Sequence, residues 1–120
     1  MPNQKQALGK WGEDCAARFL EEKGYAILER NLHTAHGEID LLAARDEALI
    51  FVEVKTRSSH WFAYPEDSVT RRKQTALLSA AEAYLQAHPE SSATWQFDVI
   101  AVERKPAGKP EILHFENVLA

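Results

Sequence analysis

The chain lacks several features that would point directly to a class of protein. Its 120 residues hold one cysteine, Cys15, which excludes an internal disulfide and a zinc site built from several cysteines of one chain. No apolar run approaches the roughly 20 residues that cross a bilayer, and residues 1–6 lack the apolar segment of a secretory signal. These absences and the length predict a single domain, 1–120, that is cytoplasmic and has no membrane contact.

Positive charge is scarce as well. The chain has 14 Lys and Arg residues against 18 Asp and Glu, so its formal net charge is −4. A protein with this balance does not attract nucleic acid through its overall charge. Any nucleic-acid partner would therefore have to meet a local basic patch.

Hydrophobic spacing predicts a helix, three strands, a second helix and two further strands. Apolar residues recur every three or four positions in both helices, and they alternate with polar residues in the strands. The expected helices are 7–23, before Gly24, and a second one from Ser68, capped by Asp67 or Ser68 and ending before Pro89. The expected strands are 25–30, 38–43, 49–55, 95–102 and 112–115, with a polar connection at 31–36 and a loop at 56–67.

The second and third strands read as a hairpin around the turn 45–48. A register that sets Leu42 opposite Phe51 also sets Asp40 opposite Glu53, with Lys55 next on the same side. The other face is aliphatic and holds Ile39, Leu41, Ala43, Ile50, Val52 and Val54. Since the first face also becomes apolar away from the charged residues, we expect the sheet to be covered on both faces.

The charged group on this hairpin suggests metal chemistry. Asp40 and Glu53 would supply hard oxygen ligands of the kind that Mg²⁺ or Mn²⁺ prefers, and the carbonyl of Val54 could add another. Lys55 could orient an attacking water or stabilise charge on a phosphoryl oxygen. The structural alternative is an ion-pair network at the end of the sheet, in which Lys55 only neutralises the two carboxylates.

The order of Asp40, a hairpin and Glu53-Val54-Lys55 resembles the PD-(D/E)xK nuclease core of restriction enzymes and archaeal Holliday-junction resolvases. In detail the chain resembles the bacterial YraN family. The residues that carry this match are Gly12-Glu13, Gly24-Tyr25, Arg30-Asn31, residues 37–41, residues 51–57, Pro65, Val69, Lys73 and residues 97–99. The resemblance implies an α/β fold with a restriction endonuclease-like core: a helix, a three-stranded antiparallel meander, a helix and further strands, in a mixed central sheet flanked by helices on both faces.

The same resemblance implies a function. Asp40 and Glu53 would bind the metal, Lys55 would serve the catalytic water, and Glu13 would join the catalytic site from the first helix. The implied activity is metal-dependent hydrolysis of phosphodiester bonds in DNA, with branched or damaged DNA in repair or recombination as candidate substrates. A symmetrical four-way junction would require a homodimer that presents two sites.

The remaining candidate residues concern nucleic-acid binding. Arg57, Arg71, Arg72 and Lys73 could form a phosphate-binding rim, and Trp61 could stack on exposed bases. Three of these cations open the second helix, where the macrodipole disfavours them, and an anionic partner is one explanation. The alternatives are a solvated face and a loop that caps the core. Two other functions stay open: a non-catalytic nucleic-acid-binding accessory module with the same fold, and a purely structural interaction domain.

Overall fold

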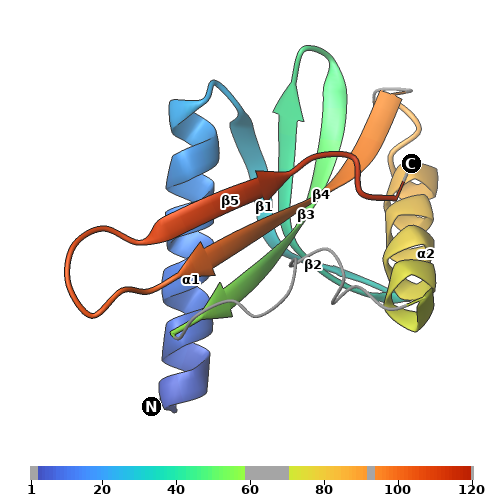
Figure 1. The fold of residues 1–120 in the computed structure, drawn as a ribbon. Helices are drawn as coiled ribbons and strands as arrows, with labels where there is room; N and C mark the ends of the chain where they lie inside the picture. The colour runs from blue at the N-terminus through green and yellow to red at the C-terminus, as the bar shows by residue number, and fades with distance from the viewer. Residues whose placement is uncertain (1–2, 59–70, 92–93, 120) are drawn as a thin grey trace.

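The computed structural model describes residues 3–58, 71–91 and 94–119, and Figure 1 shows their arrangement. The five strands form one sheet in the order β1-β2-β3-β4-β5, in which all neighbours are antiparallel except the parallel pair β3 and β4. The elements are α1 (Gln4–Glu22), β1 (Ala26–Thr34), β2 (Gly37–Arg45), β3 (Ala48–Arg57), α2 (Arg71–Ala87), β4 (Thr94–Glu103) and β5 (Glu111–Phe115). The predicted order of elements and the mixed α/β sheet are confirmed.

Local signals at both ends set the length of α1. The side chain of Asn3 accepts a hydrogen bond from the backbone N–H of Gln6 at 2.8 Å, and the Gln6 side chain accepts one from the Asn3 N–H at 3.0 Å. This reciprocal pair satisfies two donors that the first turn of a helix leaves without intrahelical partners. The helix ends before Gly24, whose φ of +94° favours glycine.

The two helices cover opposite faces of the sheet (Figure 1). Ala16, Ala17 and Leu20 of α1 pack on one face, against buried residues that include Leu41, Ala43, Ile50, Val52, Ile100 and Val102. Leu77, Ala80 and Ala81 of α2 pack on the other, against Leu42, Phe51, Phe97 and Val99. The prediction of a central sheet flanked by helices on both faces is therefore confirmed. Neither helix among the described residues is long and apolar enough to span a bilayer.

The predicted register of the β2–β3 hairpin is also confirmed, with Leu42 paired to Phe51 and Leu41 paired to Val52. Asp46 and Glu47 form the turn, with φ angles of 49° and 68°. Two successive left-handed residues match the twist of a two-residue hairpin turn. This turn fixes which residues of β2 and β3 lie opposite each other, and so it places Asp40 near Glu53.

Two predicted boundaries are wrong. The polar connection at 31–36 is mostly strand, because β1 continues to Thr34 and pairs with β2 as far as Thr34↔Gly37. An edge strand such as β1 can expose most of its side chains, so its sequence need not alternate. The third strand runs to Arg57 because β4 pairs with it along its whole length, from Ala48↔Thr94 to Arg57↔Glu103.

The predicted face of Ile39 is wrong too. Ile39 packs in the cluster beneath α2 with Leu42, whereas Leu41 and Ala43 pack beneath α1. The alternation of β2 therefore breaks at Asp40. The pairs Leu32↔Ile39 and Arg30↔Leu41 set Asn31 across from this break, and Asn31 has a left-handed φ of 54°. The irregular backbone of β1 therefore lies next to Asp40, and strained backbone often occurs beside functional groups.

The predicted start of the second helix at Ser68, its cap at Asp67 or Ser68, and the aromatic loop with Trp61 lie outside the described residues.

Candidate metal and catalytic site

Asp40 lies where β2 separates from β3. The recorded pairs of this hairpin run from Arg45↔Ala48 to Leu41↔Val52, while β3 stays paired with β4 as far as Arg57. One step beyond Val52 comes Glu53, and the N–H of the following residue, Val54, donates to Asp40 Oδ2 at 2.8 Å. The Asp40 carboxylate therefore satisfies a backbone donor of β3 at the point where the two strands part.

The carboxyl groups of Asp40 and Glu53 interact directly, and this contact shifts the pKa of each. Their carboxyl groups are hydrogen-bonded, and Glu53 is buried within the cluster. Burial, reinforced by the hydrogen bond and charge of Glu53, raises the pKa of Asp40 from an ordinary 3.8 to about 8. Burial alone would also raise the pKa of Glu53, but hydrogen bonds from Asp40 and Lys73 outweigh it and lower that pKa. Near neutral pH the arrangement is a protonated Asp40 that donates to an ionised Glu53.

Two lysines complete the cluster. Lys73 of α2 places its Nζ 2.7 Å from Glu53 Oε2, and this ion pair leaves the Glu53 side chain 10% exposed. Burial would lower the pKa of Lys73, but the hydrogen bonds with Glu53 and Lys55 raise it. Burial, followed by the neighbouring Lys73 ammonium, lowers the pKa of Lys55. Lys55 is thus the cation of this cluster that most readily gives up its proton.

The donor set fits a divalent cation of the Mg²⁺ or Mn²⁺ type. In a partly buried site, two neighbouring carboxyls do not both ionise easily, so one of them keeps a proton. A bound cation supplies positive charge in place of that proton and allows both carboxyls to ionise. Their oxygens are hard ligands, and the Val54 carbonyl belongs to the same short segment of β3. Among the described residues no three His, Cys, Asp or Glu side chains form a metal-binding group. Most coordination positions of a cation here would therefore belong to water and substrate, as Mg²⁺ commonly allows.

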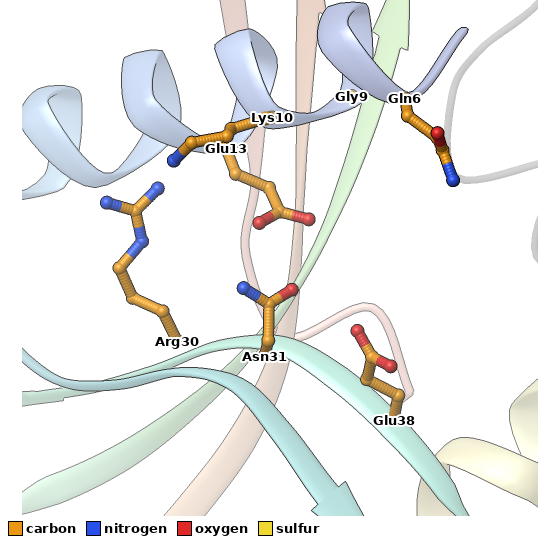
Figure 2. Close-up of a pocket in the computed structure, with 7 residues that line it drawn as sticks. All are labelled: Gln6, Gly9, Lys10, Glu13, Arg30, Asn31 and Glu38. Carbon is orange, nitrogen blue, oxygen red and sulfur yellow. The ribbon is translucent and has the colours of Figure 1, made fainter. Parts of the chain in front are cut away.

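Glu13 lies beside this cluster rather than within it. It projects from α1 into an open pocket of about 620 Å³, toward Asn31 with Arg30 on one side and Glu38 on the other (Figure 2). With its nitrogen turned toward the carboxylates, the Asn31 amide donates to Glu13 Oε1 and Glu38 Oε1, each at 3.2 Å. Burial raises the pKa of Glu13, against the opposing effects of Arg30 and Asn31. The charge of Glu13 also raises the pKa of Asp40, but by less than burial and Glu53 do.

The predicted phosphate-binding residues are placed unequally. Arg57 ends β3, donates from Nη1 to the Thr56 carbonyl at 3.0 Å, and adds its charge to the field that lowers the pKa of Lys55. Arg71 and Arg72 are exposed on the first turn of α2. Lys73 is the one cation of that turn that pairs with Glu53. Trp61 lies outside the described residues.

Sequence reasoning missed two features of this region. It placed Lys73 on a phosphate-binding rim and did not pair it with Glu53. The signal was present, since a lysine in the first turn of a helix opposes the macrodipole and needs a local anion. It also gave Asn31 no role, although an asparagine tolerates the left-handed conformation found there better than most residues.

Comparison with known proteins identifies the family. The sequence model described as "Uncharacterised protein family UPF0102" matches residues 12–102, which include Glu13, Asp40, Glu53, Lys55 and Lys73. The chain belongs to family UPF0102. This is the YraN-like family that the sequence resembles, so that prediction is confirmed.

Three relatives within UPF0102 match over nearly their full length. A UPF0102 protein of Syntrophomonas wolfei is 47% identical over 110 residues, which cover 92% of this chain and 95% of the relative. The UPF0102 protein of Syntrophotalea carbinolica is 44% identical, over 96% of this chain and 93% of the relative. That of Beutenbergia cavernae is 42% identical, over 95% of this chain and 97% of the relative. Among solved structures, Pyrococcus furiosus SfsA in complex with Ca²⁺ gives a TM-score of 0.39 at 15% identity, with coverage of 93% of this chain and 63% of that one. A likeness of that degree says nothing about the function of this UPF0102 member.

Proposed function

We propose that this protein is a metal-dependent nuclease that hydrolyses phosphodiester bonds in DNA, with branched or damaged DNA as its substrate. The observation that carries the proposal is the carboxyl pair Asp40–Glu53, whose side chains contact each other where β2 leaves β3, with Lys55 beside them. In a purely structural ion-pair network each of the two carboxylates would face a lysine of its own, whereas here the Asp40 and Glu53 carboxyls contact each other and Lys73 pairs with Glu53. A site for one divalent cation does need two carboxyls side by side.

The proposed roles follow from the contacts of each side chain. Asp40, Glu53 and the Val54 carbonyl would hold Mg²⁺ or Mn²⁺, which when bound would activate water and stabilise charge on the phosphoryl oxygens. The Val54 N–H fixes Asp40 Oδ2, and the Asp40 carboxyl also contacts Glu53. Lys55 would donate a hydrogen bond that orients the attacking water or stabilises charge on a phosphoryl oxygen. Glu13 would bind outer water molecules from its place beside Asn31.

A cleavage assay tests this proposal. Wild-type protein should cut at least one member of a panel of single-stranded, nicked, duplex and four-way-junction DNA in Mg²⁺ or Mn²⁺, and chelation should stop the reaction. Glu53→Gln and Lys55→Met should each lower the rate by about a hundredfold or more, because each removes a group that acts at the reacting phosphate. Asp46→Asn is the matched control, since Asp46 is exposed in the turn at the other end of the hairpin.

Two results would contradict the nuclease proposal. Wild-type protein that binds the panel but cuts none of it with either metal would leave the accessory-module function in its place. Cleavage that survives in Glu53→Gln would show that a contaminant or another site does the cutting.

A further inference from the structure

Lys73 pairs with one oxygen of Glu53, a carboxylate that the proposed function assigns to a bound cation. Its Nζ lies 2.7 Å from Glu53 Oε2, and the other recorded partner of the Glu53 carboxyl is Asp40. Glu53 is buried, so few approaches to its oxygens remain. Lys55 acts on Glu53 through its charge, whereas Lys73 makes the direct hydrogen bond. Lys73 also comes from a different element, the first turn of α2, and its side chain is 37% exposed.

We propose that Lys73 is a counter-ion that a divalent cation displaces from Glu53 when it binds, so that Lys73 and the metal compete for the same carboxylate. This inference rests on the metal site of the proposed function. It adds that the metal-free site is closed by an internal ammonium from α2, and that metal binding releases this ammonium toward solvent and substrate.

Charge balance supports displacement. With both carboxylates ionised, Asp40, Glu53, Lys55 and Lys73 sum to zero, so a divalent cation added without any movement would leave an excess of two positive charges in a partly buried site. Like charges so close together repel strongly where water is scarce. If Lys73 swings away, the excess falls to one, which one phosphodiester group neutralises. The exposed part of the Lys73 side chain gives it room to move, since a lysine stem can extend along the surface while its ammonium stays in water.

Calorimetric titration with Mg²⁺ and Mn²⁺ tests the competition without reference to activity. Lys73→Met removes the competing ammonium but keeps the length of the stem, and should bind metal about tenfold more tightly than wild type, because a charged hydrogen bond no longer has to be broken. Arg72→Met is the matched control. It removes the same charge one residue away, from an exposed position with no recorded contact to Glu53, and should shift the affinity by about twofold or less.

A second readout uses wild-type protein and does not depend on how the variant folds. Acetylation by a limiting amine-reactive reagent, read by peptide mass spectrometry, should be slow at Lys73 without metal and several-fold faster once the site is filled. Lys10, exposed on α1, serves as the internal reference. In Glu53→Gln the acetylation of Lys73 should already be fast and should not respond to Mg²⁺.

The outcomes separate this inference from the proposed function. If wild type binds metal, but Lys73→Met binds no more tightly and Lys73 stays protected in the filled site, competition is overturned and the metal site stands. If neither wild type nor Lys73→Met takes up Mg²⁺ or Mn²⁺, the metal site fails and the inference fails with it. Uptake by Lys73→Met alone would support competition in its strongest form.

Discussion

Two opposing effects act on the pKa of Asp40. Its carboxyl accepts from the Val54 N–H, which favours the ionised form, while burial and the neighbouring Glu53 favour the protonated form. The effect of burial and Glu53 is larger, and it raises the pKa of Asp40 to about 8. A proton and a divalent cation would each offset the negative charge of the two carboxyls. The stability of the metal-free protein should therefore depend on pH, and bound metal should remove that dependence.

In chelator, the stability of the folded protein depends on the protonation of Asp40. Between the ordinary pKa of 3.8 and the folded-state pKa of about 8, the folded chain binds a proton at Asp40 that the unfolded chain does not. Stability from this proton is therefore fully present below about pH 4 and is lost as the pH rises through 8. Asp40→Asn keeps a donor to Glu53 that does not titrate. The melting temperature of Asp40→Asn minus that of wild type should rise steadily from pH 4 to pH 8.

Saturating Mg²⁺ provides the complementary control for this measurement, since it should stabilise wild type most at high pH and leave Asp40→Asn nearly unaffected. A difference between the two melting temperatures that stays flat across this range would show that Asp40 is ionised throughout and shares no proton with Glu53.

At the scale of elements, one glycine controls how closely α1 approaches β3. A Cβ at Gly12 would lie 2.0 Å from Thr56 Oγ1 and 2.7 Å from Thr56 Cγ2, so no side chain fits between the helix and the strand. Gly9, one turn earlier, has no neighbouring atom within 4 Å of such a Cβ. The same substitution at these two positions should therefore have opposite effects.

Gly12→Ala should lower the free energy of unfolding by about 1 to 3 kcal/mol, because the clash forces α1 and β3 apart. Gly9→Ala should raise it by up to about 1 kcal/mol, because alanine is the better helix former and meets no obstacle. Urea unfolding measures both. A Thr56→Ala background removes the two nearest atoms but leaves Thr56 Cβ, 2.9 Å from the added Cβ, so part of the cost of Gly12→Ala should disappear. A cost that stays the same in that background would mean that Gly12 acts through something other than this contact.

The elements also show what a single sequence can and cannot predict here. The β2–β3 register was predictable, because alternation in both strands and a two-residue turn agree on one pairing. The face of Ile39 was not predictable. The alternation of β2 breaks at Asp40, across from Asn31 of β1, and the pattern of apolar residues within β2 gives no sign of this break. The extension of β3 to Arg57 depends on pairing with β4, which follows about forty residues later, and the Lys73–Glu53 pair depends on where α2 docks.

For the whole molecule, the net charge of −4 limits how DNA can bind. Among the described residues, Lys55, Lys73 and Arg57 act on one another at the carboxyl pair, while Arg45 lies at the turn of the hairpin, at the other end of β3. Affinity for a polyanion depends on the number of phosphates contacted, and each contact adds about 0.9 to the slope of log K against log salt for duplex DNA. With two or three contacts the slope should be between about −2 and −3, which is shallow for a DNA-binding protein.

Fluorescence anisotropy in chelator, where nothing is cut, should show this shallow slope over a series of salt concentrations. Arg57→Gln should reduce its magnitude by about one, because one phosphate contact and its released counterion are lost. Arg45→Gln removes the same charge far from the carboxyl pair and should leave the slope unchanged while shifting affinity only slightly through the overall field. Equal effects of the two variants would mean that DNA meets the protein through its general charge and not at Asp40 and Glu53, and a slope much steeper than about −3 would point to a basic surface elsewhere on the chain.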